Sequence, residues 1–570
     1  MNKLTRAGTW AVILALAAAC GDSGTSPPDV PTPVIQGVTP ETGTVGTEVR
    51  IDGSGFTATQ SQVFFGNLEA IGVELEGDAL FALAPEGLVQ GQSYDVRVVN
   101  GGTQSATRSD AFEAVEPRAL RVNGVTRPTG LKGMTIILEG NAFSDVADYG
   151  SIYFSAEDGS PVEGQIAAPE DDWSNTFIVT TVPQAVGDTS HIWVETPTGT
   201  SDSIQFVLIQ TAGFSPSTIN WTRTTDLPQG LQGLDAAFVP IESGGTTENW
   251  VYVVGGADGE MVPVTSAIRA PIEEGGSIGA WDESLVDLPE ARSFHTLAAA
   301  TAYTAALDTL TTAAHLYALG GIDADGEVVS TVYRGQVGLD GEIQGWTTER
   351  SLPEPLHSAG AVIFRGYLYL AGGADAGHGA TDAVYRARVS ADGGLGEWEA
   401  LDALPQPRAY FSLVSFGPYL YAVGGETETA SPTEGRTTDE TASVQMVRIN
   451  LRTGGIRDTW ASAGDGGQTP KARSKHSTIF AGGFLFTTSG LYSGLAGSSE
   501  NEYAGIGDGG MLSSWAGATG VNTILNRLGY SIYNQAAISF VDADGSGHVL
   551  ILGGGQVENP GEVSEAVVYF

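Results

Sequence analysis

Arginine and an aromatic or histidine side chain recur together in the C-terminal part of the sequence. At three points an arginine stands three places after a proline, and a histidine or phenylalanine follows three places later. A similar pair occurs nearer the C-terminus. The pairs are Arg292 with His295, Arg408 with Phe411, Arg473 with His476, and Arg527 with Tyr530. A funnel that combines basic and aromatic side chains suits an anionic or sugar ligand, so the spacing predicts such a site.

A structural interpretation of the same residues stays open. A residue that recurs at one position of a repeat can serve the repeat itself, for instance by tying adjacent loops together. The sequence shows no convincing arrangement of nucleophile, acid and base. We therefore expect no catalytic residues and no cofactor, and we favour binding over enzyme activity, although the funnel remains a candidate for catalysis.

Metal sites are also not expected. The seven histidines have no helical or zinc-like spacing. Asp542 and Asp544, followed by Gly545, resemble the start of a calcium loop, but the twelfth position, which needs a glutamate, is Gly553. An Asp-Gly pair between two apolar stretches is typical of a hairpin turn, and we favour that over calcium binding.

The composition limits the partners and the fold. With 26 Lys+Arg against 67 Asp+Glu, the net charge is −41, which disfavours nucleic acid and anionic membrane surfaces as partners. The 78 glycines, with 41% hydrophobic residues, indicate many short strands and tight turns rather than long helices. Residues 436–475 depart from this acidity, with seven basic and four acidic residues. We expect either an acidic partner there or scattered solvated charge.

The N-terminus is predicted to direct export. Residues 1–20 contain Lys3 and Arg6, then an apolar run that is too short to span a bilayer. The only cysteine, Cys20, follows three alanines, so the segment resembles a bacterial lipoprotein signal, although Ala17 stands where leucine is commonest. The resemblance implies acylation of Cys20, with ordinary secretion as the alternative. Residues 21–33 predict a tether, and the implied location is the cell envelope, at the outer membrane.

Two β-sandwich modules are predicted after the tether. In residues 34–116 the segments Val49–Ile51, Val63–Phe65 and Tyr94–Val99 alternate apolar and polar residues, and Gly53 and Gly55 mark a turn. This spacing resembles the IPT/TIG domain, an immunoglobulin-like sandwich. Residues 117–210 repeat the scheme more loosely. The resemblance implies spacer, dimerisation or glycan-binding modules, and we expect spacers.

Residues 214–570 are a repeat. Six apolar runs that end in small residues recur every 52 to 65 residues, each accompanied by a tryptophan. The runs are residues 251–256, 316–321, 368–373, 420–425, 485–490 and 550–555. The register resembles the kelch motif, which implies a propeller of six four-stranded blades around a channel. The chain ends before a sixth outer strand, so residues 214–230, which carry Trp221, are expected to supply it.

These patterns predict an all-β protein with two immunoglobulin-like sandwiches followed by a six-bladed kelch-type propeller. We expect a lipid-anchored envelope protein whose propeller binds a protein or glycan. One alternative is a carbohydrate-active enzyme similar to kelch-type sugar mutarotases, with its funnel around Arg292, His295, Arg473 and His476. Another is a structural envelope component. The sequence leaves the oligomeric state open.

Overall fold

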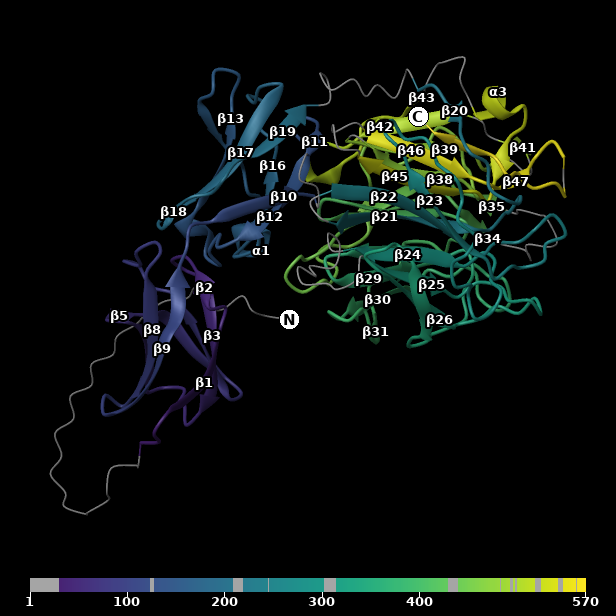
Figure 1. The fold of residues 1–570 in the computed structure, drawn as a ribbon. Helices are drawn as coiled ribbons and strands as arrows, with labels where there is room; N and C mark the ends of the chain where they lie inside the picture. Colours follow the sequence, from purple (N-terminus) through teal and green to yellow (C-terminus); the bar gives the residue numbers. More distant parts are fainter. Residues whose placement is uncertain are drawn as a thin grey trace.

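The computed structural model describes residues 30–123, 128–208, 219–243, 246–301, 314–428, 439–481, 483–492, 496–497, 500–517, 524–541, 547–559 and 561–569 (Figure 1). The predicted signal segment, Cys20 and nearly all of the tether lie outside the described residues, as do Asp542 and Asp544. Within the described residues, no helix combines the length and apolar character needed to cross a bilayer.

The first sandwich consists of two antiparallel sheets with one parallel pair, β2 with β9. One sheet contains β1 (Val34–Thr39), β3 (Glu48–Ser54), β7 (Ala79–Leu83) and β6 (Ile71–Glu76). The other contains β2 (Thr42–Gly43), β9 (Gln104–Ala114), β8 (Ser93–Asn100), β4 (Ser61–Phe65) and β5 (Leu68–Glu69). Alternate residues point inward, and the rings of Phe65 and Phe112 meet edge to face at 5.0 Å in the core.

The second sandwich repeats this plan. One sheet contains β10 (Arg118–Val122), β12 (Thr135–Asn141), β16 (Phe177–Thr181) and β15 (Trp173–Ser174). The other contains β11 (Thr129–Gly130), β19 (Ile204–Leu208), β17 (Thr189–Thr196), β13 (Ser151–Ser155) and β14 (Pro161–Glu163), with β18 (Gly199–Thr200) paired to β17. A short helix, α1 (Pro169–Asp172), and a 3₁₀ turn, η1 (Ala147–Tyr149), connect strands. Trp173 is fully buried between the sheets.

The described part of residues 219–569, called the six-sheet region below, contains six antiparallel sheets of three or four strands and three two-stranded sheets. Each large sheet is given from its first strand outward. The first sheet contains β21 (Asp235–Ser243), β22 (Thr246–Val254) and β23 (Ala267–Ile272), and the second contains β24 (Thr296–Thr301), β25 (Ala314–Leu319), β26 (Val332–Val337) and β27 (Ile343–Thr348). The third contains β28 (Gly360–Phe364), β29 (Tyr367–Ala371), β30 (Val384–Val389) and β31 (Leu395–Ala400), and the fourth contains β32 (Ser412–Phe416), β33 (Tyr419–Val423), β36 (Val444–Arg448) and β37 (Ala461–Ser462). The fifth contains β38 (Ser477–Ala481), β39 (Phe484–Thr488), β42 (Asn501–Gly505) and β43 (Ala516–Gly517), and the sixth contains β45 (Ala536–Val541), β46 (Gly547–Leu552), β48 (Val567–Tyr569) and β20 (Thr222–Arg223). The pairs are β34 (Glu426–Glu428) with β35 (Asp439–Glu440), β40 (Leu491–Tyr492) with β41 (Ala496–Gly497), and β44 (Ile532–Tyr533) with β47 (Gly555–Gln556).

The two ends of this region share one sheet. Strand β20 pairs antiparallel with β48, with Thr222 opposite Tyr569. The segment that opens the region therefore completes the sheet of its last strands. A short helix, α3 (Ile524–Leu528), precedes that sheet, and a 3₁₀ turn, η3 (Asp508–Gly510), lies in the fifth.

Buried tyrosines link neighbouring sheets. Each lies in the second strand of its sheet and donates its hydroxyl to a hairpin glycine carbonyl of the next sheet. The bonds run from Tyr252 to Gly341 (2.6 Å), Tyr317 to Gly393 (2.5 Å), Tyr369 to Gly454 (2.7 Å) and Tyr421 to Gly510 (2.7 Å). A buried hydroxyl needs a partner, so the recurring tyrosines fix the stacking of one sheet on the next.

The first strands of the six sheets contact one another in sequence, and β45 of the sixth also contacts β21 of the first. Backbone hydrogen bonds follow the same path. One residue of each sheet donates its backbone N–H to the backbone carbonyl of the corresponding residue in the preceding sheet, and the six bonds of 2.7 to 3.0 Å form a closed cycle. The donor and acceptor pairs are Phe294 and Gly233, Ser358 and Phe294, Tyr410 and Ser358, Lys475 and Tyr410, Asn534 and Lys475, and Gly233 and Asn534. These six residues, called the φ-positive set, have φ between 51° and 58°. Five are not glycine, so tertiary contacts hold them in a conformation that L-residues rarely adopt.

Candidate functional site

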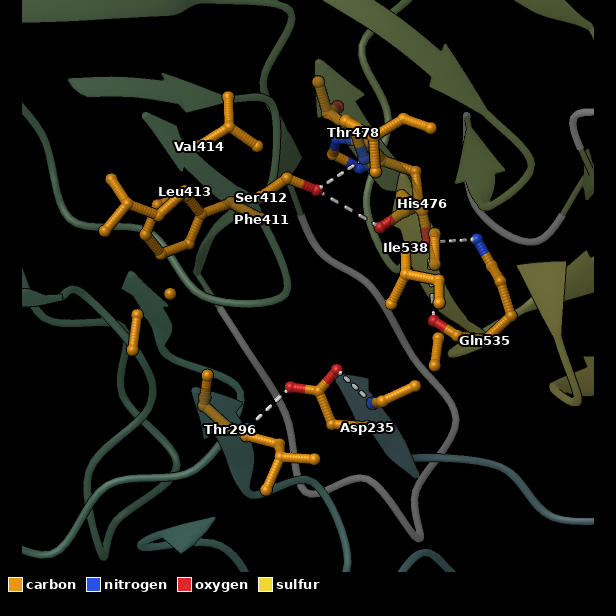
Figure 2. Close-up of a pocket in the computed structure, with 18 of the residues that line it drawn as sticks. Asp235, Thr296, Phe411, Ser412, Leu413, Val414, His476, Thr478, Gln535 and Ile538 are labelled. Atoms are coloured by element: carbon orange, nitrogen blue, oxygen red, sulfur yellow. Dashed lines mark hydrogen bonds between the residues drawn. The ribbon is translucent and has the colours of Figure 1, made fainter. Parts of the chain in front are cut away.

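A cavity of about 440 Å³ lies between the first strands of the six sheets (Figure 2). All six sheets contribute to its wall, each through the residues at and just after its member of the φ-positive set. Among the described residues that line it, Asp235 is the only carboxylate and Lys475 the only ammonium group. The volume is typical of a site for a small ligand.

Polar side chains on the wall join neighbouring first strands. Asp235 accepts the backbone N–H of Ala236 (2.8 Å) and of Leu297 in the next sheet (2.7 Å). Ser412 accepts the N–H of Thr478 at 2.9 Å, as Figure 2 shows. Burial raises the pKa of Asp235 to about 6, against the opposing effect of its two N–H donors.

Phe294 and Tyr410, which line the cavity, belong to a cluster of rings that also contains His357. The rings of Phe294 and Tyr410 meet edge to face at 6.1 Å, and His357 meets Tyr410 at 5.7 Å. The Lys475 ammonium lies 4.6 Å from the Tyr410 ring centroid and 2.7 Å from the Glu426 carboxylate. Glu426 is 1% exposed, and burial raises its pKa although Lys475 opposes the shift. The one ammonium group of the wall is therefore already neutralised by a buried partner.

Arg292, Arg408 and Arg473 do not line this cavity. All three are buried, and each backbone carbonyl accepts the N–H of the second glycine in the preceding sheet's apolar run. The carbonyls of Leu231, Leu356 and Ile532 accept the corresponding bonds in the other three sheets. Arginine and aliphatic residues thus share one buried position, called the arginine slot below. The three arginines therefore lie inside the repeat and do not form a ring around this cavity.

The partners of the three arginines differ. Arg408 donates to the carbonyls of Gly424 (3.0 Å) and Ser443 (3.3 Å), and burial lowers its pKa to about 10. Arg473 forms an ion pair with buried Glu502 at 2.5 Å. Arg292 pairs instead with Glu290, whose side chain is 61% exposed.

His295 and His476 border the cavity but fill a second shared position, one residue after the φ-positive set. In the other sheets Leu234, Ala359, Phe411 and Gln535 occupy it. The side chain is wedged against the glycine pairs: a Cβ on Gly255 would stand 2.8 Å from the His295 ring, and one on Gly372 2.8 Å from Phe411. Burial lowers the pKa of both histidines to about 3, so they are neutral at pH 7. This position, called the wedge position below, explains the recurring glycines.

The sequence comparison placed the sixth unit in the wrong register. Arg527 and Tyr530 were aligned with Arg292 and His295, but Ile532 and Gln535 occupy the equivalent positions. Arg527 lies in α3 and is exposed, and the Tyr530 hydroxyl contacts Ser564 at 3.0 Å. Helix α3 directly precedes these positions, and residues 518–523 before it lie outside the described residues.

Sequence analysis did not single out Asp235 or Gln535, and it included Lys475 only as the last residue of the basic stretch 436–475. A signal for Asp235 was present. The residue two places after each member of the φ-positive set occupies an equivalent position in the six sheets. These residues are, in sheet order, Asp235, Thr296, Gly360, Ser412, Ser477 and Ala536. Asp235 is the one charged residue at this position, and an alignment of all six units is needed to recognise it.

The basic stretch 436–475 is matched by carboxylates of the same chain. Arg448 forms an ion pair with buried Asp172 of the second sandwich, and Arg457 reaches Asp171 at 3.4 Å and Asp172 at 3.5 Å. Arg452 donates to the Trp173 carbonyl. Lys471, Arg473 and Lys475 pair with Glu500, Glu502 and Glu426. Arg436 lies outside the described residues.

Apolar contacts extend this interface. The sheet that contains β12 and β16 faces the six-sheet region, and β13 and β17 lie on the far side (Figure 1). Phe177 and Val179 pack with Phe364 and Leu451, and Arg365 pairs with Glu139 at 2.6 Å. The second sandwich is therefore docked on the six-sheet region by both apolar and charged contacts.

The fold and cavity define an all-β protein with an immunoglobulin-like module and a multi-sheet region around a small cavity. The family model for the IPT/TIG domain matches residues 33–114, which confirms the prediction for the first sandwich. No curated protein of similar sequence is found. A solved structure described as "Structure of YjhT" aligns over 60% of this chain and 95% of its own, with 12% identity and a TM-score of 0.41.

Proposed function

We propose that the chain is an exported envelope protein, lipid-anchored through Cys20, whose six-sheet region is a closed six-bladed propeller of the kelch type that binds a glycan or protein ligand. The cavity between the six first strands carries this proposal, because it combines a suitable volume with hydroxyl, amide and aromatic groups on one wall. Envelope attachment is supported by the signal-like segment and tether in the sequence.

The modules before the propeller differ in the role we assign to them. The first sandwich is a spacer between anchor and propeller. The second is a bracket that holds the propeller, since its acidic side chains meet Arg448 and Arg457. No pair of carboxylates lines the cavity among the described residues, and this favours binding over acid–base catalysis.

A glycan array with residues 21–570, followed by NMR of any bound sugar, tests the function. We expect binding without anomer exchange. Ala361→Phe, which fills the cavity from its wall, should abolish binding, and Leu339→Phe, at a side chain 51% exposed, should leave it unchanged. Anomer exchange would instead support the alternative of a mutarotase-like enzyme. Binding that survives Ala361→Phe would place the ligand elsewhere.

Closure of the propeller has its own test. Deletion of residues 214–230 removes β20, which pairs with the C-terminal strand β48. We expect the six-sheet region to lose stability as a whole because both edges of the ring become exposed. Unchanged cooperative melting of the truncated chain would count against closure.

A further inference from the structure

Asp235 departs from the pattern of its repeat position. The equivalent residues in the other five sheets are neutral and small: Thr296, Gly360, Ser412, Ser477 and Ala536. Ser412 accepts a backbone N–H from the next sheet just as Asp235 does. A hydroxyl is therefore sufficient for the link between strands, and the negative charge of Asp235 needs another explanation.

Among the residues that the structure describes, that charge has no cationic partner. No Lys, Arg or His nitrogen of the described residues lies within 4.0 Å of the Asp235 carboxylate. Lys475, the one ammonium group on the wall, is 2.7 Å from Glu426. Each Asp235 oxygen accepts one backbone N–H, and an ionised carboxylate has capacity for more. An ionised group in such a cavity favours a ligand that brings the opposite charge.

Gln535 supplies a second, independent observation on the same wall. Its side chain is 8% exposed and donates from Nε2 to the Ser477 hydroxyl at 3.0 Å. Its Oε1 is buried and has no hydrogen-bond partner among the described residues. Gln535 lines the cavity, and its amide oxygen has unused capacity to accept a hydrogen bond, although the ring nitrogens of His295 and His476 at the same wedge position also have no partner among the described residues. Asp235 and Gln535 come from the first and last sheets, whose first strands are in contact, and Figure 2 shows both on the wall.

We propose that the cavity binds a hydroxylated primary amine of about the size of an amino monosaccharide, with its ammonium group on Asp235 and a donor on Gln535 Oε1. An ammonium group offers three donors, which fits a wall that presents a carboxylate and an unpartnered amide oxygen. Thr296 and Ser412 supply neutral polar groups for ligand hydroxyls. The inference deepens the proposed binding function and rests on it.

Calorimetric titration of residues 21–570 at pH 7 with glucosamine, glucose and N-acetylglucosamine tests the proposal. The three sugars differ at one substituent, and only the first carries a charged amine. We expect glucosamine to bind at least about tenfold more tightly than the other two, as a charge-assisted hydrogen bond implies. Equal affinity for the three sugars would overturn the inference and leave the proposed binding function standing. Failure of every sugar to bind would overturn the inference, and the glycan array would then decide separately on the proposed binding function.

Asp235→Ser is the diagnostic variant because Ser412 already occupies the equivalent position in the fourth sheet. Near-UV circular dichroism checks its fold. We expect the preference for glucosamine to disappear and the affinity for glucose to remain. A preference that persists in the variant would overturn the role of Asp235.

The pH dependence of the preference for glucosamine is a second measurement. The preference should decline in the parent chain as the pH falls below about 6, where Asp235 becomes protonated, and should not change with pH in Asp235→Ser. The other ionisable groups that line or approach this wall are His295, His357 and His476, which stay neutral at pH 6, Tyr410, whose pKa is raised by burial, and the Lys475–Glu426 pair. An identical pH profile in both chains would assign the effect to one of them and contradict the proposal.

Discussion

Two sets of three arginines in the six-sheet region differ in their surroundings. Arg292, Arg408 and Arg473 fill the arginine slot inside the sheets, a position that three other sheets fill with leucine or isoleucine. Arg448, Arg452 and Arg457 flank or lie in the hairpin between β36 and β37 and bind carboxylates and a carbonyl of the second sandwich. The first set occupies a position that aliphatic residues fill in the other sheets, whereas the second set has partners in another domain.

This difference shows that, in a repeat protein, the recurrence of a residue type does not by itself indicate a binding role. The arginines that return at one register position are all buried inside the sheets, although their partners differ, and none of them lines the cavity. The interface arginines do not recur, and their partners are specific. In a chain with 26 basic and 67 acidic residues, most cations have a carboxylate of the same chain within reach. A basic stretch is thus a poor indicator of an external partner.

The largest effect should come from Arg473→Leu. The substitution leaves Glu502, 3% exposed, without its ion-pair partner, and an unpaired buried charge costs about 3–5 kcal/mol. Urea unfolding of the six-sheet region measures the loss. The double variant Arg473→Leu with Glu502→Leu should recover most of the stability, because leucine already fills this slot at Leu356. A double variant as unstable as the single one would show that the slot does not tolerate an aliphatic side chain.

Acidification should produce the next largest effect. Burial lowers the pKa of His295, His357 and His476 to about 3, against 6.5 in the unfolded chain. The unfolded state therefore binds more protons below pH 6.5, and stability is lost as the pH falls from 6.5 towards 3. Between pH 7 and pH 5 the loss is at most about 2 kcal/mol for each histidine.

His295→Leu with His476→Phe isolates this effect, because Leu234 and Phe411 fill the same wedge position. The urea midpoint of the double variant should fall less between pH 7 and pH 5 than that of the parent chain. Equal shifts in the two chains would assign the acid sensitivity to other groups. The comparison also separates the histidines from the relief of charge repulsion, which affects both chains alike.

Arg448→Ala should have a smaller effect that is confined to the interface. Asp172 keeps Arg457 at 3.5 Å as a second partner, so we expect a loss of about 1–3 kcal/mol in docking and little change in the six-sheet region itself. Hydrogen exchange at β15 and β16 should increase. Arg388→Ala is the matched control, since Arg388 faces Tyr367 as Arg448 faces Tyr419 but is exposed. Similar exchange in the two variants would contradict the bracket role of the second sandwich.

The sequence was sufficient for the all-β fold class, for the IPT/TIG domain and for the positions of the strands. The six apolar runs are second strands of six sheets, such as β29 and β33, because alternation and glycine punctuation are local properties. The candidate site was harder to predict from the sequence. Arg408 and His476 stand at regular positions, but only the packed structure shows that one binds carbonyls and the other is wedged against glycine.

What escaped sequence analysis depends on long-range geometry. Asp235 is notable only beside Thr296 and Ser412, which lie 61 and 177 residues further along the chain. The partners of Arg448 and Arg452 lie more than 270 residues away in the second sandwich. Nothing in the local pattern indicates which carboxylates the basic stretch 436–475 will meet, because that is decided by how the domains pack.

The smallest effect is expected from Arg292→Leu, which sharpens the comparison within the arginine slot. Arg292 is as buried as Arg473, but its partner Glu290 is 61% exposed and stays solvated when the arginine is removed. The lost contact with the Tyr333 ring, 5.5 Å from the guanidinium, is worth about 0.5–1 kcal/mol, and the apolar side chain regains part of that by burial. Urea unfolding beside Arg473→Leu should therefore show a change below about 1 kcal/mol. A loss as large as that of Arg473→Leu would mean that the slot requires the guanidinium itself, and the aliphatic residues of the other sheets would no longer be its equivalents.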